Sequence, residues 1–154
     1  MRWLLTLALV AVISGSGLAS GTDIGFSIRN GSNGNFMAHI GFYLDGYPID
    51  FRSQLVFGSP EGVFITGEVL HTFPAFLFLR PYIAGGLAMG LTAYTTANEL
   101  RIRFGERFYA IGTVGVQFPA RGYQPYLEIS QYIGSENFQR VTVGFIVEQN
   151  LRFW

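Results

Sequence analysis

Cysteine and lysine are both missing from this chain, and each absence excludes a class of protein. Without cysteine, a disulfide framework and a lipid-modified cysteine are both excluded. All 10 basic residues are arginine, and 10 acidic residues balance them, so the formal net charge is zero. Nucleic-acid-binding surfaces need clustered positive charge, and we therefore expect no nucleic-acid partner.

Charge of either sign is scarce, whereas apolar residues are abundant. Charged residues make up 13% of the chain and aromatic residues 16%, which is an unusual balance for a soluble secreted protein. A long, clean apolar run is nevertheless lacking, because the best candidate, residues 74–94, contains Arg80, prolines and several glycines. A lone lipid-exposed helix tolerates these residues poorly, so we expect no transmembrane helix.

The first residues have the layout of a secretory signal peptide. Arg2 precedes an apolar run over residues 3–13, and a stretch of small residues follows, ending in Gly17-Leu18-Ala19. This run is shorter than the roughly 20 residues that cross a bilayer. We expect a signal peptide over 1–19 and one domain over 20–154; the alternative is a buried N-terminal strand or an anchor.

The apolar residues recur at period two, which is the repeat of a β-strand. Alternation of apolar and polar residues runs through residues 49–57, 63–71 and 126–133. It is clearest from Arg140 onward, where the odd positions are apolar up to Val147 and again at Leu151 and Phe153. The pattern predicts strands that each present one apolar and one polar face.

Turn-forming residues fall between these runs at regular spacing and delimit eight strands. The longest connection, residues 91–106, either forms a loop or extends its neighbours. Most of the strands have about the length, 9 to 11 residues, that crosses the hydrocarbon layer when tilted. The predicted strands are 23–29, 36–45, 49–57, 63–71, 76–90, 107–118, 123–133 and 140–153.

An even number of antiparallel strands can close into an up-and-down barrel without a free edge. Two such barrels fit the alternation. A soluble lipocalin-like barrel in the periplasm would hold a small ligand in an apolar interior, whereas a transmembrane barrel has its apolar face outside. The polar face here is sparse and mixed with Gly, Tyr and Thr, which favours the transmembrane barrel.

Two of the predicted strands share a Pro-Tyr signature, in "RPYIAGGLA" from Arg80 and "QPYLEIS" from Gln124. With these motifs the chain resembles the OmpA and OmpX-like superfamily of small outer-membrane barrels. The resemblance implies an eight-stranded transmembrane barrel in the bacterial outer membrane, with a structural or surface-interaction role. It implies outer-membrane lipid and the barrel-assembly machinery as partners, and a monomer. Eight strands leave room only for side chains, so we expect no wide pore.

The C-terminal "VGFIVEQNLRFW" resembles the last strand that such barrels present to their assembly machinery. Phe153 is in phase with the lipid-facing residues, and Trp154 lies one place beyond. Turning Trp154 outward would also turn Arg152 toward lipid, at a cost of roughly 2 to 4 kcal/mol near the midplane. We therefore expect Phe153 to be the main anchor of a signal formed with Trp154; the alternative is an ordinary strand.

Signals for catalysis are weak. Some barrels of this kind act on lipid A through His, Ser and an acidic residue, but no serine lies two residues from His39, and His71 is at a turn. The two histidines also lack the spacing of a metal site. We expect no enzyme, no cofactor and no metal, with a lipid-A-modifying barrel as the alternative.

The interior is expected to contain a charge cluster of Arg52, Glu68 and Arg80. Pairing across "GSPEG" places Arg52 opposite Glu68, and a tight turn at "TFP" would bring Arg80 within about two residues of the same level. All three residues are on the polar face of their strands. The alternative is that they meet interfacial water near the barrel ends.

The terminal strand generates a prediction about assembly. Deleting Phe153 and Trp154 together should strongly reduce the amount of folded barrel, because it removes the aromatic anchor. Changing Trp154→Ala should reduce it less, since Phe153 remains. The heat-modifiable band of membrane fractions on gels measures folded barrel, and equal amounts in the deletion variant and the wild type would contradict the assignment.

Overall fold

The computed structural model describes residues 21–30, 35–46, 48–59, 62–96 and 99–148. Among these residues no helix is long and apolar enough to span a bilayer. The described chain forms eight strands. They are β1 (Gly21–Asn30), β2 (Phe36–Leu44), β3 (Asp50–Ser59), β4 (Gly62–Thr72), β5 (Arg80–Thr96), β6 (Glu99–Gln117), β7 (Tyr123–Gly134) and β8 (Phe138–Glu148).

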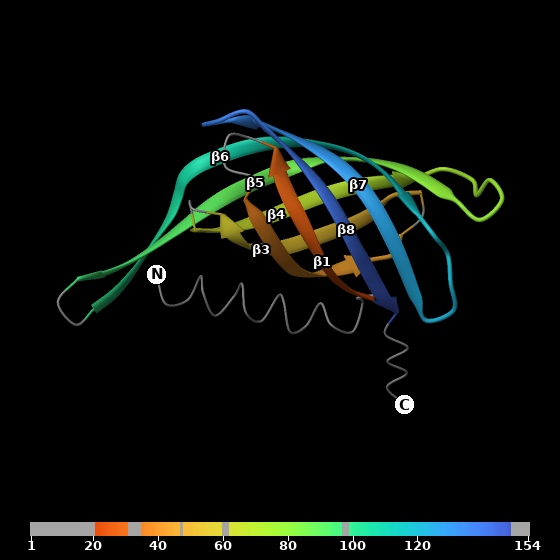
Figure 1. Cartoon of the computed structure of the whole chain (residues 1–154), viewed down its shortest axis with the longest axis horizontal. Coiled ribbons are helices and arrows are strands. Elements are labelled where there is room, and N and C mark those ends of the chain that lie inside the picture. The colour runs from red at the N-terminus through yellow and green to blue at the C-terminus, as the bar shows by residue number, and fades with distance from the viewer. Residues whose placement is uncertain (1–20, 31–34, 47, 60–61, 97–98, 149–154) are drawn as a thin grey trace.

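Each strand pairs antiparallel with the next, and β8 pairs with β1, so the sheet closes into the predicted up-and-down barrel (Figure 1). Gly21 at the start of β1 lies opposite Glu148 at the end of β8. We call this end of the barrel the terminal rim and the other end the opposite rim. The connections after β2, β4 and β6 lie at the terminal rim.

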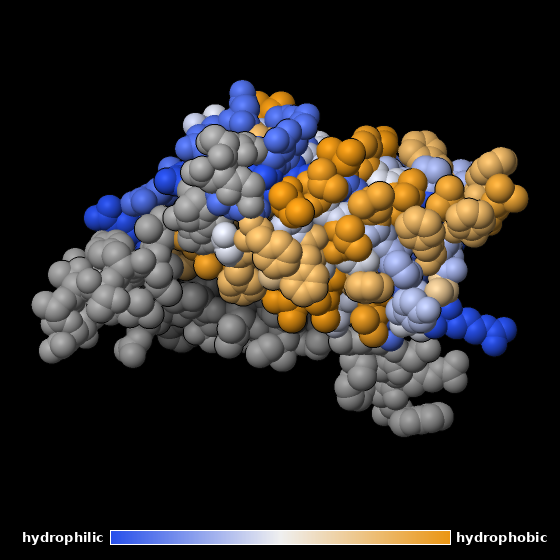
Figure 2. All heavy atoms as spheres, in the orientation of Figure 1, coloured by the Kyte–Doolittle hydropathy of each residue, from blue (hydrophilic) through white to orange (hydrophobic). Residues whose placement is uncertain are grey.

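The two faces of the barrel wall differ in polarity, as the alternation predicts. On β8 the inward Thr142 is 0% exposed, whereas the outward Val143 is 54% exposed. The same holds on every strand, where large apolar side chains are exposed on the outer side, and Figure 2 shows them on one face of the barrel. A soluble barrel would bury these residues, so the lipocalin-like alternative is wrong. Polar side chains inside and apolar ones outside are the arrangement of a transmembrane barrel.

The strand bounds differ from the prediction at β5 and β6. β5 begins at Arg80 and not at residue 76, whereas residues 91–96 and 99–106 extend the two neighbouring strands, which was one of the two expectations for this connection. β4 pairs with β5 only as far as Leu91, and β7 pairs with β6 only from Tyr109. Cross-strand pairing within the hairpin therefore continues beyond the barrel, and Figure 1 shows it projecting at the left.

Inward side chains fill the lumen in three tiers. An aromatic and aliphatic tier lies near each rim, and a polar tier lies between them. The tier at the terminal rim consists of Tyr43, Leu70, Tyr82, Tyr126 and Ile146. The tier at the opposite rim consists of Met37, Val56, Phe64, Ala88, Tyr109, Ile111, Tyr132 and Phe138.

The two Pro-Tyr motifs build much of the terminal-rim tier. Pro81 is exposed on the outer face, whereas Tyr82 and Tyr126 point inward and are almost completely buried. Each tyrosine has a glycine directly opposite on the next strand, Gly115 for Tyr82 and Gly144 for Tyr126. A Cβ added at Gly115 would lie 2.5 Å from Tyr82 Cζ. The glycines thus provide the space in which the tyrosine rings lie.

This packing predicts opposite effects for two glycines of β6. Gly115→Ala should destabilise the folded barrel by about 1 to 3 kcal/mol, because the tyrosine must move. Gly112 faces outward, and a Cβ there meets no atom within 4 Å. Gly112→Ala should leave stability unchanged or raise it by about 0.4 to 1 kcal/mol, through the unfolded chain. Urea unfolding in lipid vesicles measures both, and equal midpoints would contradict the packing argument.

Candidate functional site

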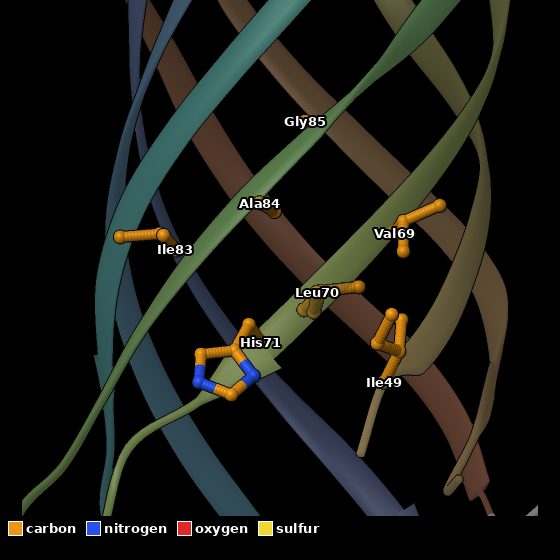
Figure 3. A pocket seen from close by; sticks show the side chains of 7 residues that line it. All are labelled: Ile49, Val69, Leu70, His71, Ile83, Ala84 and Gly85. Carbon is orange, nitrogen blue, oxygen red and sulfur yellow. The ribbon is translucent and has the colours of Figure 1, made fainter. Parts of the chain in front are cut away.

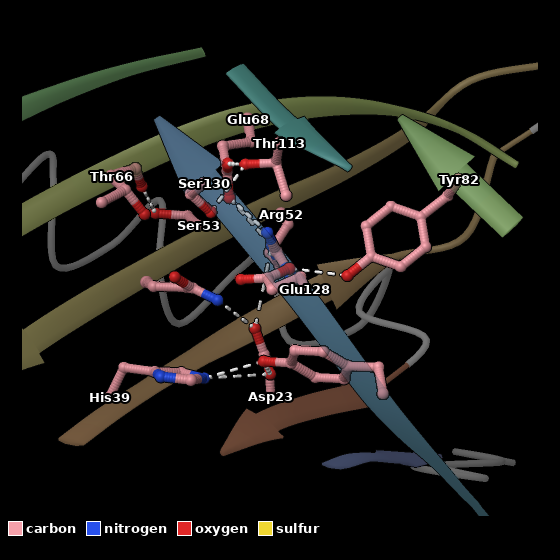
Figure 4. Close-up of polar contacts among 12 residues, drawn as sticks. Asp23, His39, Arg52, Ser53, Thr66, Glu68, Tyr82, Thr113, Glu128 and Ser130 are labelled. Carbon is pink, nitrogen blue, oxygen red and sulfur yellow. Dashed lines mark hydrogen bonds and ion pairs between the residues drawn. The ribbon is translucent and has the colours of Figure 1, made fainter. Parts of the chain in front are cut away.

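The polar tier of the lumen, which we call the central tier, is a closed network of charged and polar side chains. Its residues are each 2% exposed or less, and nearly every strand contributes (Figure 4). Three carboxylates lie with two guanidinium groups, one imidazole and one amide. These residues are Asp23, His39, Arg52, Gln54, Glu68, Glu128 and Arg140.

Arg52 is at the centre of this network. Its guanidinium donates to Glu68 on the neighbouring strand, with Nη2 to Oε2 at 2.6 Å and Nε to the same oxygen at 3.0 Å. Its Nη1 donates across the lumen to Glu128 Oε2 at 2.8 Å, and Tyr82 donates its hydroxyl to the same oxygen at 2.6 Å. Arg52 thus connects β3 to β4 and, through the interior, to β7.

Asp23 forms the second part of the central tier. Its carboxylate accepts from the Tyr126 hydroxyl at 2.6 Å and from Gln54 Nε2 at 2.7 Å. His39 Nε2 lies 2.8 Å from the Tyr126 oxygen and 3.4 Å from Asp23 Oδ1. Since the tyrosine proton points to Asp23, the tyrosine oxygen is free to accept from an Nε2–H tautomer of His39.

Arg140 and two hydroxyls complete the network. Arg140 Nη2 lies 3.2 Å from Gln54 Oε1 and 3.4 Å from Glu128 Oε1, so it joins β8 to β3 and β7. The Thr113 hydroxyl lies 2.9 Å from both Glu68 Oε1 and Ser130 Oγ, so it can donate to the carboxylate and accept from the serine. Each carboxylate of the tier therefore has at least two hydrogen-bond donors.

The mouth of the barrel at the terminal rim carries a second, smaller group of acidic residues. The Asp50 carboxylate accepts from the Tyr43 hydroxyl at 2.5 Å and from the Gly46 amide at 3.0 Å. Partial burial and, next, the negative charge of Asp50 raise the pKa of Asp45. Among the described residues, no three His, Asp or Glu side chains are grouped so as to hold a metal ion.

The structure places Arg52 and Glu68 together, with the register that the sequence predicts. It does not place Arg80 with them. Glu68 lies opposite Gly86, six residues along β5 from Arg80, or about 20 Å at the rise of a strand. The tight turn at "TFP" was the error, because the chain turns later, at Leu77 and Phe78. Arg80 instead lies near the terminal rim, where its charge acts on Asp45.

The other residues singled out in the sequence are separated from this network or lie outside the description. His39 points into the lumen, whereas His71 is exposed on the outer side and its Nδ1 lies 3.2 Å from the Pro48 carbonyl. The wall therefore separates the two histidines. Phe153, Trp154 and the signal-peptide region lie outside the described residues, so the expectations about them stay predictions.

Sequence reasoning missed Glu128, Asp23 and Arg140 as members of the network. All three are on the inward phase of their strands, which the alternation reveals. Phase shows that a side chain enters the lumen, but not which side chain it meets there. Glu128 meets Arg52 across the barrel, and strand pairing carries no signal for such a contact.

No protein-family model matches the chain, and no curated protein matches it in sequence. Solved structures do match its fold. The N-terminal β-barrel domain of Pseudomonas aeruginosa OprF is 12% identical, with a TM-score of 0.58 over 85% of this chain and 98% of that one. Neisserial surface protein A is 10% identical, with a TM-score of 0.63 over 83% and 94%. The outer-membrane enzyme PagL is 11% identical, with a TM-score of 0.50 over 82% and 99%.

These similarities show the fold. In fold, the chain is an eight-stranded transmembrane β-barrel like these outer-membrane barrels.

The network predicts a large effect on stability from removing one carboxylate. Glu68→Gln should destabilise the barrel by roughly 3 to 5 kcal/mol, because it leaves the Arg52 charge in the lumen with one carboxylate fewer. The matched control is Glu106→Gln, whose carboxylate is 43% exposed and pairs with Arg103 at 3.0 Å. Exposed pairs contribute about 1 kcal/mol or less. Urea midpoints in vesicles compare the two, and a smaller shift for Glu68→Gln would contradict the assignment.

Proposed function

We propose that the protein is an outer-membrane barrel, closed to solutes, that presents the β5–β6 hairpin for contact with another molecule at the cell surface. The apolar outer belt and the fold of its neighbours support the location. The filled lumen supports closure, because aromatic tiers at both rims enclose a central tier whose charges already have partners. We further propose that the protein is a monomer in outer-membrane lipid and that the barrel-assembly machinery inserts it. In this proposal it has neither a catalytic activity nor a cofactor.

The observation that carries this proposal is the outer edge of β5 in the hairpin. Among the described strands, residues 92–96 of β5 pair with residues 99–103 of β6, and no third strand pairs with residues 92–96. On the outer edge of β5, the backbone N–H and C=O groups of residues 92–96 face no further described strand, so an extended segment of another chain could pair with them. Within the barrel wall the backbone groups of each described strand pair with strands on both sides, whereas this edge of β5 can accept an added strand.

The hairpin also has the chemistry of a water-exposed segment. Arg103 is 62% exposed and pairs with Glu106, and both lie beyond the last residues that pair with the barrel. Outer-membrane barrels have short turns on the periplasmic side and longer connections outside the cell. The same orientation would place the hairpin outside the cell.

An enzyme is the weaker interpretation. One neighbour in fold is described as an outer-membrane enzyme, but a likeness at 11% identity carries no catalytic residues. His39, which has an acidic neighbour in Asp23, is enclosed in the lumen at 2% exposure. A lipid substrate outside the wall would not reach it.

The orientation is testable with single cysteines, since the chain has none of its own. A membrane-impermeant maleimide added to intact cells should label Arg103→Cys on the hairpin and leave Arg121→Cys, in the connection after β6, unlabelled. The protein should also stay with membranes after carbonate extraction and begin near Ser20. Labelling of Arg121→Cys but not of Arg103→Cys would contradict the proposed orientation.

Closure is tested separately in planar bilayers. The purified barrel should conduct little, because the aromatic tiers leave no open path in the lumen. Large, stable conductance steps from the wild-type protein would contradict a closed barrel while leaving the surface role of the hairpin to the labelling experiment.

A further inference from the structure

The connection between β4 and β5 carries an unusual sequence for a turn. Residues 73–79 read "FPAFLFL" and contain no charged or polar side chain. The other two connections at the terminal rim differ, since one contains Asp45 and the other Arg121. Connections of a barrel are usually polar because they meet water. We expect a wholly apolar connection to contact something other than water.

The backbone holds this segment as an extension of the hairpin with its apolar side chains outward. Phe73 N donates to the Pro81 carbonyl at 2.9 Å, beyond the last residue pair of β4 and β5. Phe76 and Leu79 exchange two backbone hydrogen bonds of 2.8 and 3.0 Å and close a tight turn. The side chains of Phe76, Leu77 and Phe78 are 70%, 80% and 68% exposed.

Leu77, in the turn, has a backbone conformation that residues with a Cβ rarely adopt. Leu77 has φ of 57°, in the left-handed region, and no other non-glycine residue of the described chain has positive φ. Glycine would adopt this conformation without steric cost, whereas a residue with a Cβ is strained in it. The most exposed apolar side chain of the turn thus occupies a position that favours glycine. Such strain points to a use for the side chain itself.

The apolar tip is continuous with the lipid-facing belt. The His71 ring lies edge-on to Phe73, with centroids 5.0 Å apart, and next to it the outer surface is hollowed into a groove of about 290 Å³ (Figure 3). The residues around this groove come from β4 and β5 and from position 49, just before β3. Its lining residues are Ile49, Val69, Leu70, His71, Ile83, Ala84 and Gly85. In Figure 2 apolar residues likewise reach the right-hand end of the molecule, where Figure 1 places this hairpin.

We propose that Phe76, Leu77 and Phe78 form an interfacial anchor that inserts into the phospholipid leaflet at the terminal rim. Phenylalanine and leucine are suited to the boundary between head groups and acyl chains. The absence of charge in the segment removes the main cost of entering it. The groove beside His71 then holds part of an acyl chain of the same leaflet. A protein partner fits less well, because a specific interface buries about 800 Å² on each partner and a two-residue turn offers far less.

The anchor is testable by fluorescence quenching, because a cysteine-free chain allows one label at a chosen place. The variant Leu77→Cys is labelled with an environment-sensitive fluorophore and folded into phosphatidylcholine vesicles. The quenchers are a phosphatidylcholine with a nitroxide on its acyl chain and, separately, aqueous iodide. Ile83→Cys, in the outer belt, serves as the lipid-exposed control, and Arg121→Cys, at the same rim, as the water-exposed control.

We expect the label at position 77 to be quenched by the nitroxide lipid about as strongly as at position 83, and to be as protected from iodide. Quenching by iodide equal to that at position 121 would overturn the anchor. Protection from both quenchers would also overturn it, since protein would then cover the tip. If Leu77→Cys does not give a heat-modifiable folded band, Phe78→Cys is measured in its place with the same expectations.

Discussion

The fold depends on one constraint: charges enclosed by a lipid-surrounded wall must find their partners inside it. Arg52 meets this constraint with Glu68 on the adjacent strand and Glu128 across the lumen, at 2.6 and 2.8 Å. Because side chains alternate strictly along a strand, a register slip of one residue would turn these charges into lipid. The network therefore selects the register of the wall, and the closed wall in turn supplies the low-polarity surrounding that strengthens the network.

Contacts between adjacent strands were readable in the sequence, and contacts across the lumen were not. Arg52 and Glu68 follow from the parity of one short hairpin. Glu128 and Arg140 reach their partners through the interior, and such contacts depend on strand tilt and stagger, which no local pattern encodes. Arg80 was misplaced because the prediction put the turn at "TFP". The chain instead turns at Leu77, which has a left-handed backbone conformation that turns usually fill with glycine.

Space inside the lumen comes from placing large side chains opposite glycines on the neighbouring strand. Tyr82 lies over Gly115 and Tyr126 over Gly144, and both tyrosine hydroxyls donate to carboxylates of the central tier. The terminal-rim tier and the central tier are thus linked. Each of these tyrosine rings fills space in the first tier, and its hydroxyl donates to a buried carboxylate of the second. Each of the two signature tyrosines thus donates to one carboxylate, Tyr82 to Glu128 and Tyr126 to Asp23.

β5 joins the two features that depart from a plain barrel. At its start it leaves the apolar tip of residues 76–78, and at its end it enters the hairpin, where no described strand pairs with the outer edge of residues 92–96. Between them it is held by hydrogen bonds to β4 on one side and β6 on the other. Because it is paired on both sides, β5 moves together with the barrel wall. If the tip next to the start of β5 is held in lipid, the tilt of the barrel is limited. The angle at which the hairpin meets a binding partner is then limited as well.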